Sequence, residues 1–551
     1  MEARGLLAEI FQDDDLLLLA KSVGEFGECE LVPYLRELGR EEFPDRFIPL
    51  VAGSGFLGTA IPSEFGGQGG TLEAFLPVIE GIAAYDGSLA LTLAAHESLA
   101  TTHVFLAGSA EQKRKYLLEL TTGRKMGAWC LTEPQAGSNI FNDMRAKLSR
   151  TSQGWILNGE KTFITNGCHA DLFVVLARAI GQDGQEAGIT CCLVERQSDP
   201  HGITPTPLHG KMGMWHSDTA AVRFDDVFIA EDSVLGAVGN AGQVARRVLS
   251  RGRIGVAALA LGLARDSLQR AATYTKTRNI GNASLFELPL TRAKLHAMEE
   301  SLWVAWQAVR SAARLADQSK PFKVQACMAK VLATETALRI ADEAIQLLGG
   351  YGYMTDYKVE QNYRDMRMLT IGEGASEILR LAIAGDVVET GLASGDLVPS
   401  RESLESDAGL ARASASSPAN PSHQAFQLAS RSFRIALEHI KQAEGGADLR
   451  SNLQSSAMKL ADLSTKLWVA GQVIRSRAQL VDRGTASARI LSLAEAFLLN
   501  ASLEISYEAM ELLRAHGLTD SRLLTNYSAL LETTARNRSA ESPLLLDAEE
   551  S

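Results

Sequence analysis

The sequence predicts a mostly α-helical protein with a small β domain in its middle and an extra helical domain near its C-terminal end. Apolar residues recur every three to four positions through residues 1–125 and again through 236–395, as in helices that pack on one another. Between them, residues 126–235 contain short β-type runs separated by glycine and aspartate turns. Residues 396–424 are rich in Ser, Ala, Asp and Pro and predict a linker, after which helical periodicity returns over 425–540.

Length, charge and cysteine usage narrow the class of protein. The 551 residues suffice for three or four domains, and the net charge of −12 argues against a nucleic-acid ligand. The six cysteines show neither a CxxC spacing nor a disulfide-dense pattern, so we expect the reducing cytosol and no metal site. A cytoplasmic location is also expected because no basic leader and no membrane-length apolar run is visible.

In the N-terminal region, helices are expected around one glycine-rich loop. The GGQGG sequence at residues 66–70 lacks the GK[ST] of a phosphate-binding loop and is interpreted as a turn. The helix predicted over residues 88–108 is apolar on more than one face, so we expect it to be buried.

The middle and C-terminal elements follow from a change in period. Strands are expected at Trp155–Leu157, Phe173–Leu176 and Ile189–Val194, where β-branched and aromatic residues gather. Helices of an antiparallel bundle are expected at residues 256–278, 291–316, 322–348 and 376–392.

Glu373 is the candidate general base. It lies between Gly372 and Gly374, so no neighbouring Cβ obstructs the approach of a ligand. The apolar Leu369 and Ile371 just before it could form a pocket that raises its pKa. A Gly-Glu-Gly tripeptide by itself is also common in ordinary loops, so the motif needs further support.

That support comes from three separated motifs that resemble signatures of the acyl-CoA dehydrogenase family. They are CLTEPQAGS at residues 130–138, KTFITNG at 161–167, and the stretch from Gln346 to Arg380 that contains GGYGY, an Arg-Asp pair and Glu373. The resemblance extends from about residue 47 to 385, and more weakly beyond. It implies an N-terminal helical domain, a β-barrel-like middle domain and a C-terminal four-helix bundle, with appended helices as in the very-long-chain branch.

The resemblance implies FAD as the cofactor. The loop at residues 131–138 and the strand at 163–165 would lie against the flavin ring, and Arg278 would reach the pyrophosphate across the interface of a homodimer. The residues that the resemblance assigns to the flavin are Cys130, Leu131, Thr132, Ser138, Phe163, Ile164, Thr165, Arg278, Gln346, Gly349, Gly350, Ala375 and Glu377.

The resemblance also implies the reaction, which is α,β-dehydrogenation of an acyl-CoA to trans-2-enoyl-CoA as in fatty-acid β-oxidation. Glu373 would be the base, because the alternative position of the base, just before Arg253, is Gly252 here. Electron-transfer flavoprotein or a similar acceptor would be the partner. Small residues in helix 88–108 would leave room for a long acyl chain. The substrate contacts implied are Ala90, Ala94, Ser138, Ser250, Arg253 and Gly374.

Several departures from the family pattern leave alternatives open. Asn139, Trp215 and Gln361 replace an aspartate, an arginine and a basic residue, and residues 279–282 lack the usual Gln-Phe-Gly. A non-enzymatic assembly protein that retains the fold is one alternative. An acyl-thioester dehydrogenase or oxidase of secondary metabolism is another, and the thioester carrier is either coenzyme A or a carrier protein.

Overall fold

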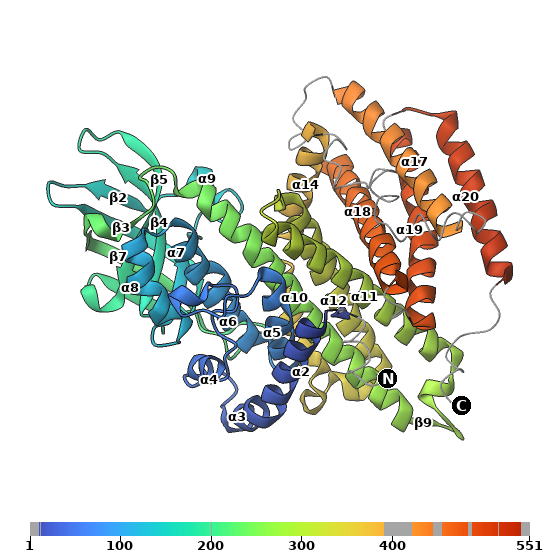
Figure 1. Cartoon of the computed structure of the whole chain (residues 1–551), viewed down its shortest axis with the longest axis horizontal. Coiled ribbons are helices and arrows are strands. Elements are labelled where there is room, and N and C mark those ends of the chain that lie inside the picture. Colours follow the sequence, from blue (N-terminus) through green and yellow to red (C-terminus); the bar gives the residue numbers. More distant parts are fainter. Residues whose placement is uncertain are drawn as a thin grey trace. The chain divides into compact units, whose positions relative to one another are not determined.

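The computed structural model of the protein describes residues 10–11, 13–199, 201–390, 421–444, 454–482, 487–515 and 517–540. The chain divides into two compact units (Figure 1). The first contains Met1–Met298, Ala312–Ala326 and Ala333–Ala375, and the second contains Glu299–Ser311, Cys327–Leu332 and Ser376–Ser551.

Helices form the N-terminal part of the first unit. They are α2 (Asp14–Phe26), η1 (Gly27–Leu31), α3 (Val32–Glu37), α4 (Phe47–Gly53), α5 (Leu72–Tyr85), α6 (Gly87–Ala94), η3 (Ala95–Thr101), α7 (Thr102–Ala107) and α8 (Ala110–Thr121). Asp86 separates α5 from α6 and caps the second helix, because its carboxylate accepts the N–H groups of Ser88 and Leu89 at 2.8 and 3.1 Å. The segment at residues 66–70 is a turn as predicted, with Gly66 and Gly69 at φ 80° and 70°.

The buried helix expected over residues 88–108 consists of three segments. α6 passes directly into η3, which is a π-helix, and α7 follows. The hydroxyls of Thr101 and Thr102 donate to the carbonyls of His96 and Glu97, five residues earlier, at 2.8 and 2.9 Å. Such wide turns are frequent at functional sites, and they leave no mark in the apolar periodicity of a sequence.

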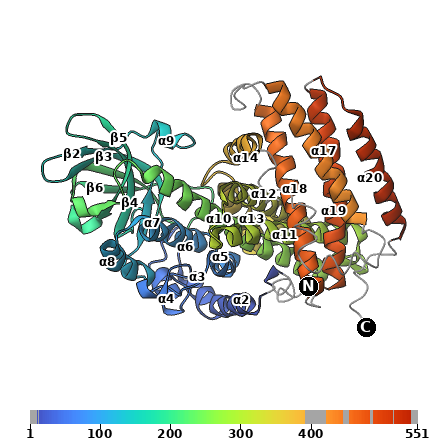
Figure 2. The same cartoon turned by 45° about the horizontal axis from the view of Figure 1, so that its top comes forward.

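The middle of the chain forms one sheet in the order β6-β7-β3-β2-β4-β5-β8, with β1 beside β4. The strands are β1 (Gly127–Cys130), β2 (Lys147–Arg150), β3 (Trp155–Thr165), β4 (Leu172–Ile180), β5 (Glu186–Glu195), β6 (Ile203–Pro207), β7 (Thr219–Ile229) and β8 (Val234–Leu235). The three predicted runs lie inside β3, β4 and β5. Side chains of β4 alternate between a core within the sheet domain, which contains Phe173, and a second core, which contains Val174 and residues of α7, α8 and α10. Figure 2 shows α7 and α8 beside the sheet.

Long helices complete the first unit. They are α10 (Ala241–Thr277), α11 (Pro289–Asp317), α12 (Lys323–Leu348) and α13 (Val359–Leu369), with a small hairpin of β9 (Asn279–Ile280) and β10 (Ala283–Ser284) after α10. α11 and α12 also contribute residues to the second unit. The sequence predicted that α10 begins at residue 256, which was wrong. The helix begins 15 residues earlier because Ala241, Ala245 and Val248 share one face and pack into the core beside the sheet.

The second unit contains α14 (Ser376–Thr390), α17 (Pro421–Glu444), α18 (Gln454–Asp482), α19 (Ala488–Ala515) and α20 (Ser521–Ala540). Most of the predicted linker lies outside the described residues, but its last residues, from Pro421, belong to α17, so that boundary was wrong. Among the described residues, one helix, α19, is long enough and apolar enough to cross a membrane, contrary to the expectation from the sequence. Half of its most apolar segment is buried inside the structure.

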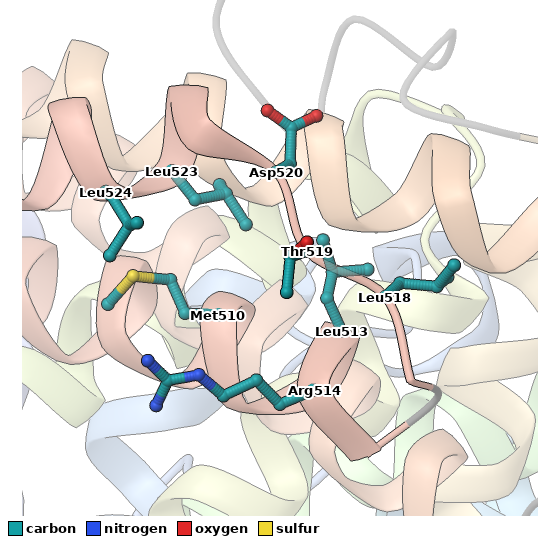
Figure 3. Close-up of a pocket in the computed structure, with 8 residues that line it drawn as sticks. All are labelled: Met510, Leu513, Arg514, Leu518, Thr519, Asp520, Leu523 and Leu524. Carbon is teal, nitrogen blue, oxygen red and sulfur yellow. The ribbon is translucent and has the colours of Figure 1, made fainter.

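A pocket of about 50 Å³ lies between α19 and α20 (Figure 3). Its lining includes Met510, Leu513 and Leu523, and its rim includes Asp520, which accepts hydrogen bonds from Arg522 and lies 3.0 Å from His439 Nε2. This volume suffices for a few water molecules and is far smaller than the several hundred Å³ of an ordinary ligand site.

Candidate active site

Glu373 lies against Gly252 of α10. A Cβ atom at position 252 would come within 2.8 Å of Glu373 Oε1 and closer still to Oε2, so only glycine leaves room for this carboxylate. Glu373 has φ 54°, a backbone conformation that is uncommon outside glycine and asparagine. Arg253 Nε donates to the Glu373 carbonyl at 3.0 Å and holds the strained peptide in place. Strain of this kind clusters at functional sites.

The apolar neighbour of this carboxylate is Leu99 of η3. Its Cδ2 would lie 2.8 Å from a Cβ at Gly252, so the leucine methyl and the carboxylate approach the same point of α10. Leu369 is buried as expected, but the side chain of Ile371 is 57% exposed, so Ile371 forms no apolar pocket. The sequence did not reveal Leu99, because 274 residues separate it from Glu373 and the π-helical turn that orients it has no sequence signal.

Helix α6 and η3 together leave only two residues partly exposed. Between Gly87 and Thr101, every residue is buried except Leu91 and Leu99. Ala90 and Ala94, which were expected to line an acyl cavity, are 0% and 2% exposed and pack inside the protein. The two leucines are the apolar residues of this stretch that remain partly exposed, and the assignment of Ala90 and Ala94 to the acyl cavity stays a prediction.

A buried ion pair joins the two motifs expected at the flavin ring. Lys161 Nζ on β3 lies 2.8 Å from Glu133 Oε1 and also donates to the Leu131 carbonyl at 3.0 Å. Glu133 accepts two further N–H groups, from Arg145 and Ala146, at 2.6 and 2.9 Å. Burial lowers the pKa of Lys161, and the charge of Glu133 opposes that effect. The pair fixes the loop after β1 beside the end of β3, a role that the sequence analysis missed although both residues stand in its motifs.

The surface beside this ion pair fits a flavin. Phe163 has φ 56° and is 70% exposed, which is unusual for a large apolar residue on β3, a strand that pairs with β7 on one side and β2 on the other. Within the described parts of the chain, the hydroxyls of Thr132, Ser138 and Thr165 make no hydrogen bond to another residue, so they remain available to a polar cofactor. Cys130, Leu131 and Ile164 have buried side chains, so only their backbone groups could contact a ligand.

A second group of predicted flavin residues lies at the other end of α10. Arg278 follows Arg253 by 25 residues, which corresponds to about 38 Å along a helix. Arg278 is exposed, with its guanidinium 6.0 Å from the ring of Tyr351, just after Gly349 and Gly350. Both glycines have open space where a Cβ would stand, and Gly349 has φ 61°, so a ligand can approach the backbone closely. Gln346 lies in the last turn of α12, immediately before them.

The remaining predicted residues differ in their surroundings. Ser250 is only 2% exposed and its hydroxyl donates to the Arg246 carbonyl at 2.9 Å, which argues against a contact with substrate. Gly374 has φ 107° and Ala375 is half-buried, directly after Glu373. Glu377 belongs to the first turn of α14, in the second unit.

Three family profiles match the chain in order. "Acyl-CoA dehydrogenase, N-terminal domain" matches residues 13–124, "middle domain" matches 128–227 and "C-terminal domain" matches 240–388. The human mitochondrial short-chain specific acyl-CoA dehydrogenase is 36% identical over 68% of this chain and 90% of its own length. The 3-(aryl)acrylate reductase of Clostridium sporogenes is 35% identical over 68% of this chain and 98% of its own length.

Solved structures extend the likeness to the appended helices. An acyl-CoA dehydrogenase from Bacillus anthracis, in complex with FAD, covers 97% of this chain and 92% of its own, with a TM-score of 0.82 and 25% identity. A chain in a structure of the electron transferring flavoprotein of Acidaminococcus fermentans covers 69% of this chain and 98% of its own, with a TM-score of 0.65 and 31% identity. The chain therefore belongs to the acyl-CoA dehydrogenase family and is a FAD-dependent acyl-CoA dehydrogenase with additional C-terminal helices.

Proposed function

We propose that Glu373 is the base with which this enzyme removes the α-proton of a fatty acyl-CoA. The observation that carries the proposal is the position of its carboxylate against Gly252, with Arg253 bound to its carbonyl. Gly252 lacks a side chain of its own, so no other carboxylate comes from that position of α10. The product is a 2-enoyl-CoA, as in fatty-acid β-oxidation.

The groups around Glu373 have different roles in the removal of the α-proton. The thioester carbonyl oxygen needs hydrogen-bond donors as enolate charge develops, and the resemblance assigns the N–H of Glu373 to that role. The Leu99 methyl lies on the same side of Gly252 as the carboxylate and forms the apolar wall beside it. FAD, when bound, supplies the acceptor for the hydride that leaves the β-carbon.

Our proposal for the chain length of the substrate uses the two half-buried leucines of α6 and η3. The long-chain expectation depended on Ala90 and Ala94, which are buried, and on the appended C-terminal helices. We propose instead that Leu99 limits the width of the cavity near the reacting carbons and that Leu91 limits its depth. Leucine fills more space than alanine, and the relative named as short-chain specific supports the same direction. The preferred substrates are therefore short acyl chains.

A second copy of the chain would complete the flavin site. One group of flavin residues surrounds Phe163 on β3, and the other surrounds Arg278 at the C-terminal end of α10. Tyr353 and Met354, near Arg278, are 84% and 52% exposed, and Ile280 of the hairpin is 55% exposed. Such an apolar surface is typical of an interface, so we propose a homodimer. The similarity to a chain in the electron transferring flavoprotein structure supports that flavoprotein as electron acceptor.

Anaerobic mixing of the FAD-loaded protein with saturated acyl-CoA substrates of four to eighteen carbons tests the proposal. We expect the flavin absorbance to bleach, most rapidly with short chains. Bound FAD that no acyl-CoA of the series reduces would contradict the proposed substrate class.

A further inference from the structure

Three ionisable side chains from distant parts of the sequence meet inside the first unit. Asp86 stands between α5 and α6, His216 lies in the loop between β6 and β7, and Asp365 lies on α13. His216 Nδ1 lies 3.0 Å from Asp86 Oδ2, and the Met214 N–H donates to Asp365 Oδ1. Asp86 and Asp365 are 3% and 1% exposed, so water screens neither carboxylate.

The two carboxylates are close to each other as well as buried. A Cβ at Gly87, the residue directly after Asp86, would lie 3.5 Å from Asp365 Oδ2. Within the described chain, Asp365 Oδ2 has no hydrogen-bond partner at normal distance, and a polar group near this carboxylate is the amide of Gln361, whose Nε2 also lies 3.5 Å from Asp86 Oδ2. An ionised oxygen in such a place would be costly, whereas a protonated one is tolerated much better.

The nearby arginines neutralise this pair of carboxylates only in part, because the charge of Arg364 lowers the pKa of Asp365 against the larger effect of burial. Arg40 and Arg364 stack on the two faces of Trp215, with guanidinium carbons 3.8 and 3.9 Å from the ring centre. Arg364 also pairs with Glu360 at 2.7 Å. Trp215 stands where the resembled family carries an arginine, so this position supplies no charge. His216, the next residue, is the cation in direct contact with Asp86.

Other charged groups surround the cluster from each neighbouring element. They are Lys358 before α13, Asp266 on α10, Lys211 and Asp218 in the segment between β6 and β7, and Glu41 from the N-terminal segment. Lys358 Nζ forms an ion pair with Asp266 Oδ2 at 3.7 Å. Lys211 Nζ donates hydrogen bonds to the Ser217 carbonyl and to Thr219 Oγ1. These lysines moderate the field of the carboxylates without contacting Asp365.

We propose that Asp86, His216 and Asp365 form a proton-operated clamp that joins α6 and α13 to the loop between β6 and β7. In the closed form His216 is protonated on Asp86, and Asp365 carries a proton. Loss of both protons leaves two adjacent carboxylates and a neutral imidazole, and the three elements then repel rather than attract. α6 leads to Leu91 and Leu99, and α13 leads to Glu373, so the clamp acts on elements of the active site.

The direction of the pH dependence follows from the shifts. Burial first, and then the charge of Asp86, raise the pKa of Asp365 to about 7. Burial would lower the pKa of His216, but the hydrogen bond and charge of Asp86 reverse the effect and raise it. Both groups are more easily protonated in the folded state, so their contribution to stability is complete at acidic pH and is lost as the pH rises through about 7. The pKa of Asp86 is lowered, chiefly by His216 against the effect of burial, so its own contribution is lost only in strong acid.

Thermal unfolding of the full-length, FAD-loaded protein between pH 6 and 8.5 tests the clamp without using catalysis. We expect the wild-type Tm to fall by about 2–4 °C across this range. Asp365→Asn retains an acceptor for the Met214 N–H but cannot ionise, so it should remove most of that fall and raise the Tm at pH 8.5. Asp14→Asn changes an exposed aspartate to the same amide and should run parallel to wild type.

A second variant tests the contribution of the charge on His216. His216→Gln can still donate a hydrogen bond to Asp86 but cannot carry charge, so it should lower the Tm at pH 6 and leave it nearly unchanged at pH 8.5. An Asp365→Asn curve parallel to wild type, or an equal loss in His216→Gln at both pH values, would overturn the proposal. If Asp365→Asn does not fold, the His216→Gln comparison decides alone.

Discussion

The carboxylate of Glu373 occupies the space that a side chain at Gly252 would fill, with Oε1 2.8 Å from the position of that absent Cβ. The two residues are 121 positions apart in the chain. Arg253, next to Gly252, binds the Glu373 carbonyl and keeps the glutamate at φ 54°. One turn of α10 therefore both makes room for the carboxylate and fixes its backbone.

Glu373→Gln should retain the fold and the flavin but lose reduction by acyl-CoA. The amide is nearly isosteric with the carboxylate, but it cannot accept the α-proton, so the rate of flavin bleaching should fall by at least about 10²- to 10⁴-fold. Stopped-flow absorbance of FAD-loaded protein measures this rate, and the absorbance ratio of flavin to protein confirms loading. Bleaching at the wild-type rate would exclude Glu373 as the base.

Gly252→Ala should displace the carboxylate by direct overlap with the new methyl group. Because misplacement of a reacting group by about 1 Å can cost about 100-fold in rate, we expect a fall of that order in kcat with FAD retained. Gly242→Ala is the matched control in the same helix, since its Cβ would meet only the tip of Arg246 at 3.4 Å. Equal activity of the two variants would show that Glu373 is not held against α10 in solution.

Leu99→Ala and Leu91→Ala should widen and deepen the acyl cavity. We expect Leu91→Ala to shift the preferred substrate towards longer chains, and Leu99→Ala to admit chains branched near the thioester. Each added methylene is worth about 0.8 kcal/mol of burial, so the preference should move several-fold per carbon. Bleaching rates over the acyl-CoA series measure the shift.

Ala90→Gln provides the contrast on the same helix. Ala90 is fully buried, so a glutamine there should lower the Tm by overpacking the core and leave the order of substrate preference unchanged. A change in chain-length preference without loss of stability would show that Ala90 lines the acyl cavity.

Arg278→Ala should weaken flavin retention and the dimer together, because a guanidinium on a pyrophosphate makes charge-assisted hydrogen bonds. Lys276→Ala removes a nearby exposed cation that contacts Phe286, and it should have little effect. Gel filtration with absorbance at protein and flavin wavelengths reports both properties. Unchanged flavin content in Arg278→Ala would assign the contact to another residue.

Glu133→Gln should destabilise the β domain, because it leaves Lys161 buried without a counter-charge. Removal of one partner of a buried pair typically costs about 3–5 kcal/mol, and the loop beside Phe163 should lose its position and its flavin. Glu160→Gln, which changes the exposed glutamate next to Lys161, is the control. Denaturant unfolding of both variants gives the difference in stability.

The motifs of the sequence were sufficient for the family, for the mostly helical fold with its central sheet, and for FAD. Local patterns carry this information: β-branched runs at Phe173–Leu176 can be recognised without knowing their partners, and Glu373 stands in a motif whose residues are consecutive. Local patterns were not sufficient where packing between distant residues determines the structure. The start of α10 depended on a core beside the sheet, and the burial of the alanines of α6 could not be predicted from their spacing.

Contacts between residues that are far apart in the chain could be identified from the tertiary structure alone. Leu99 reaches Glu373 because a π-helical turn and the missing side chain of Gly252 bring them together, and neither contact has a local sequence signal. Asp86, His216 and Asp365 likewise meet from three separate elements, and their charges depend on burial and proximity. Arg278 likewise comes within 6.0 Å of the Tyr351 ring, 73 positions later in the chain, because α10 ends beside the segment that follows α12.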